Sequence, residues 1–364
     1  MAADATTLRM ISRYQEEAPA PLFLAGHFQS PPRNYHLQGK VKVDVQRDGR
    51  DVAIVVKNIN LGPNKNQSTA YSSKEFTPPL LDEEGDINSW ETFDRLAGQD
   101  PFQDVEFVDK TMKDAFRLFR KLDAKIRRTT ELMCSQIFQG AKLELASNDG
   151  TQYELDFQGK ASHFPTASTP WGTMGADPYR DLGTLANEIR KNGKRSPYRL
   201  VAGPEALDLM LRDPTIKDRL DNRGMSVGQI RAPEPRGVGA NFHGWLNIDG
   251  FIFELFSYAE SYDDPVSGQD TLYVPNNKVV MLSRDARLDL THGGVPLFRR
   301  PDNLAARFLP SRIADPETGL DMTTNAYISP DGKRLVVGAA ARPLPVPTAI
   351  DTFGCLTVYP DGDS

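Results

Sequence analysis

The chain has 364 residues, of which 39% are hydrophobic and 25% charged, a composition that predicts a folded protein with two or three lobes. Its formal net charge of −6 excludes nucleic-acid binding by bulk charge and leaves only a local basic surface for contact with phosphate. The two cysteines, Cys134 and Cys355, are too few for a disulfide framework and lack metal-ligand spacing. The sequence has no signal-peptide core and no apolar run of about eighteen residues, so we expect neither standard secretion nor a membrane span.

Residues 1–36 contain several prolines and only one short apolar patch, at Leu22 to Leu24. Such a stretch cannot form a core alone and predicts an extended arm. We expect this arm to contact another chain or to lie along the outside of its own lobe.

A long loop is predicted after the arm. The segments VKVDV and DVAIVV, between Lys40 and Asn58, flank an Asp48-Gly49 pair and predict a hairpin. The polar, proline-containing stretch that follows predicts a two-stranded loop with a return limb. We expect its acidic run, Asp82 to Glu84, to lie in a hydrated turn.

An amphipathic helix is predicted from Asp100 to Gly140. Asp100 caps it, Pro101 fits its first position, Gln103 completes a capping box, and Gly140 is expected to end it in the left-handed conformation. At the standard rise, roughly 30 helical residues span about 45 Å. Its apolar stripe consists of Ala115, Phe119, Leu122, Ile126, Met133 and Ile137.

The opposite side of this helix carries a row of basic residues, namely Lys113, Arg117, Arg120, Arg127 and Arg128. The simplest interpretation is the hydrated side of an amphipathic helix. The alternative is a functional surface that faces DNA or the acidic surface of another subunit, whose binding would weaken with salt.

The rest of the chain predicts a hairpin, a mixed lobe and a strand-rich tail. The hairpin follows Gly140, and a helix then begins at Asp177-Pro178 and closes at Gly193. The tail strands would return to the first lobe and make it discontinuous in sequence. Further helices are expected at 204–212 and 214–220, and strands at 198–203, 244–258, 272–282, 286–291, 327–329 and 335–340, with a last strand ending at Val358.

No catalytic, cofactor or metal site is predicted. Nucleotide-binding and nucleophile-elbow motifs are absent from the sequence, and Asp263-Asp264 does not follow the calcium-loop spacing. The five histidines are scattered without ligand spacing, and we expect ordinary surface or turn roles for them. They are His27, His36, His163, His243 and His292.

The order of arm, long loop, spine helix, hairpin, inserted lobe and returning strands resembles the tailed-bacteriophage major capsid (Johnson) fold. Local motifs between residues 95 and 358 are similar to those of the lambda-like major capsid protein E family. These motifs are RRTTELMCSQIFQGAKLEL (127–145), YRLVAGPEALDLMLRDPTIKDRL (198–220), YVPNNKVVML (273–282) and RPLPVPTAIDTFGCLTV (342–358).

This resemblance implies an α+β capsid subunit. Its parts would be an N-terminal arm (1–36), an extended loop (37–95), a peripheral domain with the spine helix (96–170), an axial α/β domain (171–322) and the returning strands of the peripheral domain (323–364). It also implies no enzymatic activity and no cofactor.

The implied function is to self-assemble, through hexamers and pentamers, into the icosahedral head shell of a tailed bacteriophage around double-stranded DNA. Implied partners are portal and scaffolding or protease proteins and, in some relatives, a decoration protein, with assembly in the bacterial cytoplasm and no membrane. Two alternatives stay open. One is an encapsulin-like compartment that encloses a cargo enzyme, and the other is a cytosolic hydrolase, which would be a compact monomer or small oligomer.

Overall fold

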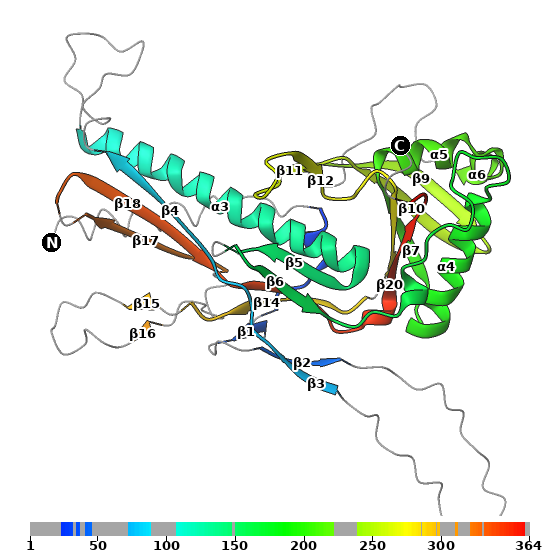
Figure 1. The fold of residues 1–364 in the computed structure, drawn as a ribbon, viewed down its shortest axis with the longest axis horizontal. Helices are drawn as coiled ribbons and strands as arrows, with labels where there is room; N and C mark the ends of the chain where they lie inside the picture. Colours follow the sequence, from blue (N-terminus) through cyan, green and yellow to red (C-terminus); the bar gives the residue numbers. More distant parts are fainter. Residues whose placement is uncertain are drawn as a thin grey trace, which may run out of the picture. The chain divides into compact units, whose positions relative to one another are not determined.

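The computed structural model (Figure 1) describes residues 23–31, 34–36, 41–45, 72–88, 107–147, 150–221, 239–284, 286–295, 297–298, 310–311, 321–329 and 331–360. They divide between two compact units. Unit 1 takes the described parts of Met1–Val41, Thr77–Met133 and Leu290–Pro345. Unit 2 takes those of Lys42–Phe76, Cys134–Asp289 and Val346–Ser364. Among the described residues, no helix has the length and apolar character needed to span a membrane.

Unit 1 is built on a helix packed against a three-stranded sheet. The helix is α3 (Phe107–Gly140), of which the residues up to Met133 belong to unit 1. The sheet has the antiparallel order β17 (Thr323–Ile328), β18 (Arg334–Ala341), β4 (Leu81–Asn88). Figure 1 shows α3 lying along these strands. The predicted stripe is confirmed, because its first four residues, Ala115, Phe119, Leu122 and Ile126, are buried in one cluster with Val337 and Ala339 of β18.

The two ends of α3 compare differently with their predictions. The expected start signals at Asp100, Pro101 and Gln103 lie outside the described residues. At the other end Gly140 is the last helical residue, as predicted, but the left-handed residue is Ala141, with φ 54°. The prediction of a left-handed Gly140 is therefore wrong. The turn falls one residue later because the Ala141 amide donates to the Ile137 oxygen at 2.8 Å while its own carbonyl accepts from Phe157 at 3.0 Å.

Residues 23–36 pack into unit 1 as far as they are described. Leu24 is fully buried, and Phe23 and Phe28 are buried as well. Residues 25–27 form the short 3₁₀ helix η1, and β1 (Tyr35–His36) pairs in parallel with β14 (Leu288–Gly293). The expectation of an arm outside the core is therefore wrong for these residues, because buried polar groups and a strand edge of unit 1 bind their backbone. Residues 1–22 lie outside the described part of the chain.

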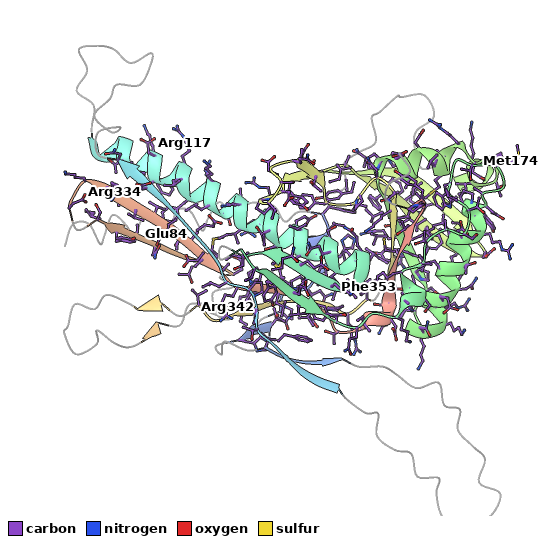
Figure 2. The ribbon with its side chains drawn as sticks, in the orientation of Figure 1. Glu84, Arg117, Met174, Arg334, Arg342 and Phe353 are labelled. Carbon is purple, nitrogen blue, oxygen red and sulfur yellow. The ribbon has the colours of Figure 1, made fainter. Side chains whose placement is uncertain are left out.

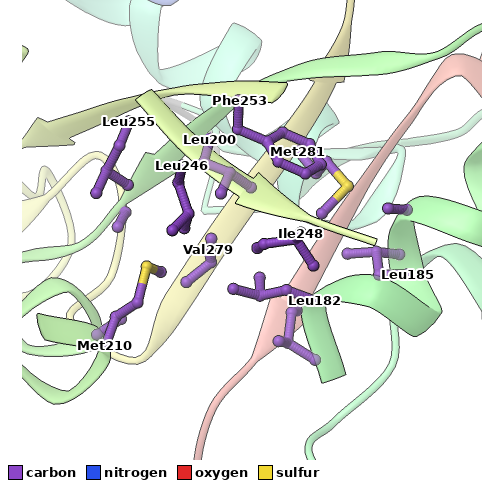
Figure 3. Close-up of a cluster of buried hydrophobic side chains, with 14 of the residues drawn as sticks. Leu182, Leu185, Leu200, Met210, Leu246, Ile248, Phe253, Leu255, Val279 and Met281 are labelled. Atoms are coloured by element: carbon purple, nitrogen blue, oxygen red, sulfur yellow. The ribbon is translucent and has the colours of Figure 1, made fainter. Parts of the chain in front are cut away.

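Unit 2 contains a six-stranded sheet covered by helices. The strand order is β20 (Phe353–Thr357), β13 (Lys278–Ser283), β7 (Pro197–Ala202), β10 (Phe251–Tyr258), β9 (Ala240–Ile248), β8 (Leu220–Asp221). The helices are α4 (Pro178–Gly193), α5 (Pro204–Arg212) and α6 (Pro214–Arg219). Their apolar sides bury one core with the sheet, and Figure 3 shows Leu182 and Leu185 of α4 beside Ile248 and Met281 of the strands.

Several local predictions in unit 2 are confirmed. Asp177 accepts the Arg180 amide at 3.0 Å and so caps α4. The hairpin after α3 is β5 (Lys142–Ala146) with β6 (Gln152–Asp156). The sequence predicts strand structure over residues 244–258 without a turn, whereas the structure turns there at Asp249 and Gly250, with φ 47° and 82°. Two positive φ values at Asp-Gly are typical of a type I′ hairpin.

The predicted loop is described only at its two limbs, and the expected strand DVAIVV (51–56) lies outside the described residues. β2 (Val41–Val45) pairs with β3 (Ser72–Phe76) as outgoing and return limbs, while the expected Asp48-Gly49 turn lies outside the described residues. The acidic run Asp82 to Glu84 belongs to β4, so its assignment to a turn is wrong. β4 keeps these residues extended because every one of its positions pairs with β18.

The limits of the two units differ from the expected domain limits. The hairpin β5–β6 groups with unit 2, residues from 290 to 345 group with unit 1, and residues from 346 onward group with unit 2. β20 does not return to the sheet of unit 1, because it pairs with β13 at one edge of the six-stranded sheet. β17 and β18 do return to the sheet of unit 1, where β18 pairs with β4.

Candidate functional surfaces

The helix face of unit 1 is strongly basic. Lys113, Arg117, Arg120 and Arg128 are exposed, and the Arg117 side chain has 78% of its surface accessible. Figure 2 shows Arg117 projecting from α3. Lys121 is also exposed between them. It is not among the predicted basic residues, although it lies one helical turn from Arg117. These five side chains form what we call the basic helix face.

The opposite face of the same sheet is acidic. On β4 the alternate residues Asp82, Glu84 and Asp86 are exposed. Glu83 lies on the helix side, where the Lys125 ammonium is 2.7 Å from its carboxylate, and Ile87 belongs to the core under α3. Because strand residues alternate between faces, the three exposed carboxylates point away from α3. We call this row the acidic sheet face.

Arg127, predicted as part of the basic row, has a different environment. Its guanidinium lies 3.0 Å from the Asp123 carboxylate and 3.3 Å from the Asp321 carboxylate. Asp123 is buried, with 2% of its side chain exposed, and Arg127 is only 26% exposed. A buried carboxylate needs a charged or hydrogen-bonding partner, so Arg127 stabilises the interior of unit 1 rather than serving as a surface contact.

Glu131 attaches the N-terminal segment to α3. This residue is fully buried. Its two carboxylate oxygens accept the backbone amides of Leu24 and Ala25, each at 2.8 Å. Two convergent amide donors at the start of η1 are a favourable environment for a carboxylate. The sequence drew attention to Glu131 only through a family-like motif, because its partners lie more than a hundred residues away.

A cavity of about 310 Å³ lies beside this attachment and is lined by η1, α3, β1 and β14. The buried ring of His292 borders it, stacks on Tyr35 with centroids 4.8 Å apart, and hydrogen-bonds through Nε2 to the Ser30 hydroxyl at 3.0 Å. Burial is the main factor that lowers the His292 pKa to about 4; the Asp321 carboxylate opposes this and the Arg127 guanidinium adds to it.

The histidines do not all occupy the expected surface or turn positions. His292 and His163 are buried, and for these two the prediction is wrong. The Nδ1 atom of His163 is 2.9 Å from the Phe353 carbonyl oxygen, and its Nε2 is 3.1 Å from the Asn192 amide. Both rings fill interior hydrogen-bonding positions. Within the described ranges, histidine, cysteine and acidic residues form no group of three or more that would bind a metal ion.

Comparisons with known proteins found a matching family model and similar solved structures. The family model described as phage major capsid protein E matches residues 6–358. The structure is similar to that of a prophage capsid protein of Escherichia coli CFT073, with TM-score 0.65, 15% identity, and 97% of this chain and 99% of that chain covered. It is also similar to a phage-related protein of Bordetella bronchiseptica RB50, with TM-score 0.50, 12% identity and 96% and 95% covered. No curated protein matches the sequence.

The fold is that of the major capsid proteins of tailed phages, which build a head shell from many copies of one subunit. The chain belongs to the phage major capsid protein E family, since the family model covers nearly its whole length. The resemblance inferred from its motifs is confirmed, and so is its function as a phage head shell protein with a structural role.

Proposed function

We propose that the chain forms an icosahedral shell around double-stranded DNA and that the basic helix face of unit 1 points toward this DNA. The observation that carries the orientation is the opposite charge of the two faces. Lys113, Arg117, Lys121 and their neighbours cover the helix side, while Asp82, Glu84 and Asp86 lie on the other side of the sheet. A shell has one face toward its contents, and a polyanion is repelled by carboxylates and attracted by cations.

Screening by salt makes contact with DNA depend on nearby charges more than on the net charge of the subunit. With a net charge of −6, the whole subunit repels DNA at long range, but salt at physiological strength screens charges beyond about 8 Å. At contact, the DNA would therefore experience mainly the cations on the basic helix face. Arg127 is left out of the proposed contact, because it pairs with the buried Asp123 and is only 26% exposed. Arg117 is also near a carboxylate, at 3.5 Å from Asp114, but its side chain is 78% exposed.

A salt-dependence experiment tests the proposed DNA contact. Purified subunits are applied to immobilised double-stranded DNA and eluted at increasing salt, comparing the wild type with the variant Lys113→Gln/Arg117→Gln/Arg120→Gln/Arg128→Gln. Each lost phosphate contact reduces the slope of log affinity against log salt by about 0.9. We expect the variant slope to be shallower by about three to four.

The matched control removes charge from the other face. The variant Asp82→Asn/Glu84→Gln/Asp86→Asn also changes exposed residues of unit 1, and we expect it to keep the wild-type slope. Equal slopes for the wild type and the helix variant would refute the proposed DNA contact.

We propose portal and scaffolding or protease proteins as assembly partners, with assembly in the cytoplasm of the bacterial host and no enzymatic activity. An encapsulin-like compartment would give particles without packaged DNA, so the nucleic-acid content of purified particles distinguishes the two. A hydrolase would stay a compact monomer or small oligomer, which negative-stain microscopy of the assembly reaction would reveal.

A further inference from the structure

We infer that β17 forms a contact between two copies of the chain, in which β17 of one copy pairs antiparallel with β17 of the other and the two sheets become continuous. This inference rests on the proposed shell function. It names one surface through which copies join, and it comes from a difference between the two edges of a single sheet.

The two edges of the sheet in unit 1 are chemically unlike. In the described part of the chain the strand order is β17, β18, β4, so β17 and β4 are the edge strands. β4 has the sequence LDEEGDIN, with four acidic residues and a glycine. Edge strands carry such charges to prevent pairing with another chain. Two β4 edges brought together would place eight carboxylates beside one another, which excludes this edge from self-pairing.

β17 has none of these protective features. Its sequence, TTNAYI, contains no charged residue, proline or glycine and consists largely of residues that favour strands. Two of its large apolar side chains are exposed, Tyr327 at 42% and Ile328 at 58%. The other four residues of β17 are buried or half-buried, so the exposed part of the strand is its C-terminal end. An uncharged edge strand is a template for another strand, and in a shell built of one protein that strand belongs to a second copy.

The geometry of antiparallel self-pairing suits a shell. The two-fold axis that relates two antiparallel strands is perpendicular to the sheet, so it turns each copy without exchanging the two sides of the sheet. The α3 helices of both copies therefore lie on the same side, and so do both acidic sheet faces. A contact of this isologous kind buries the same patch on both copies and keeps one face inward and one outward.

Cysteine cross-linking tests this arrangement. Single cysteines are placed in turn at Thr324, Asn325, Ala326, Tyr327 and Ile328, and assembled particles are oxidised and run on non-reducing gels. The native thiols, Cys134 and Cys355, are buried, so their background reaction is small. Opposed Cβ atoms in antiparallel strands lie about 5 Å apart, near the range for a disulfide. We expect most chains to form dimers at the position nearest the two-fold axis and few at distant positions.

The matched control is Glu84→Cys at the centre of β4, which is expected to stay monomeric on the same gels. Particles that assemble normally but show no cross-link along β17, or that cross-link at Glu84→Cys instead, would overturn the inference while leaving the shell function intact. A failure of the wild type to form particles with its assembly partners would instead refute the shell function itself.

Lysines introduced into β17 give a second test of this contact. In Tyr327→Lys/Ile328→Lys two lysines stand on the exposed end of β17, and because charges on an edge strand prevent pairing with another strand we expect the subunit concentration needed for assembly to rise about tenfold or more. Tyr327→Phe/Ile328→Val keeps the strand uncharged and is expected to assemble like the wild type. Circular dichroism of unassembled subunits checks that both variants fold. Normal assembly of the folded lysine variant would contradict the contact.

Discussion

At the scale of single residues, two glycines each end a helix, but only one of the two positions requires a glycine for steric reasons. Gly140 ends α3, and a Cβ placed there would meet nothing within 4 Å. Gly193 ends α4, and a Cβ there would overlap the Asp351 carbonyl oxygen. In both cases the left-handed residue is the next one, Ala141 or Lys194. Gly193 is therefore needed for a close backbone approach, and Gly140 is not.

These environments predict opposite effects of the same substitution. Gly140→Ala should raise the free energy of unfolding by about 0.5–1 kcal/mol, because alanine loses less backbone entropy in a helix. Gly193→Ala should lower it by about 1–3 kcal/mol, because the added methyl group displaces the Asp351 backbone. Urea denaturation of unassembled subunits measures both values. A destabilised Gly140→Ala would contradict the conformation described for the end of α3.

Because of His292, we expect the attachment of the N-terminal segment to become less stable in acid. Its pKa falls from the ordinary 6.5 to about 4 in the folded protein, so between these pH values the unfolded chain binds more protons than the folded one. Stability therefore falls as the pH drops from 6.5 to 4, by about 3 kcal/mol from this residue. Above pH 6.5 the residue contributes no pH dependence.

The check is a set of denaturation curves between pH 4 and 7 for the wild type and His292→Gln. We expect a shallower pH dependence in the variant, which has no titrating group at this position. His243 serves as the comparison, because its pKa is also lowered by burial but it is only half-buried. The same pH dependence in the wild type and His292→Gln would show that His292 does not titrate as described.

At the scale of elements, the attachment of η1 to α3 depends on one carboxylate. Glu131→Ala removes the acceptor of the Leu24 and Ala25 amides, and an unsatisfied buried donor costs about 1–3 kcal/mol. We expect residues 23–31 to lose hydrogen-exchange protection while the core of α3 keeps it. Glu131→Gln retains one acceptor oxygen and should give an intermediate loss. Unchanged protection in Glu131→Ala would mean that other contacts hold the segment.

Elements whose signals are local could be predicted from the sequence. The apolar stripe of α3 follows from the helical period, and the start of α4 follows from the Asp177 cap and the proline after it. The predictions that were wrong concern features that are set by residues far away in the sequence. Leu22 to Leu24 looked too small for a core because the carboxylate that binds this segment lies 107 residues away. The pairing of β20 with β13 likewise has no local signal, since any apolar strand of that length would fit the edge.

The predictions for the candidate surfaces show the same difference between local signals and distant partners. Helical periodicity placed Lys113, Arg117, Arg120 and Arg128 on one exposed face, and the structure agrees with their exposure. The same periodicity included Arg127, whose ion pair with Asp321 joins residues 194 positions apart. Charge alone cannot distinguish a surface cation from one that neutralises a buried acid. The β17 edge was equally hidden, because an edge strand is defined by its neighbours and not by its own residues.

At the scale of the whole molecule, assembly and DNA retention should respond to salt in opposite directions. Each copy carries a net charge of −6, so copies repel one another, and salt screens this repulsion. An uncharged contact such as β17 loses nothing when salt is added. The basic helix face depends on charge attraction to phosphate, which salt weakens. We expect the subunit concentration needed for assembly to fall between about 0.05 and 0.5 M salt, while DNA retention decreases.

The measurement combines sedimentation of particles with their DNA content across the salt series at pH 7. The acidic-face variant Asp82→Asn/Glu84→Gln/Asp86→Asn reduces the negative charge and should need less salt for assembly, with unchanged DNA retention. Assembly that is most efficient at the lowest salt would contradict the repulsion argument. Acidification cannot replace salt here: lowering the pH toward the sequence pI of about 5.5 reduces the repulsion, but below pH 6.5 it also weakens the structure around His292.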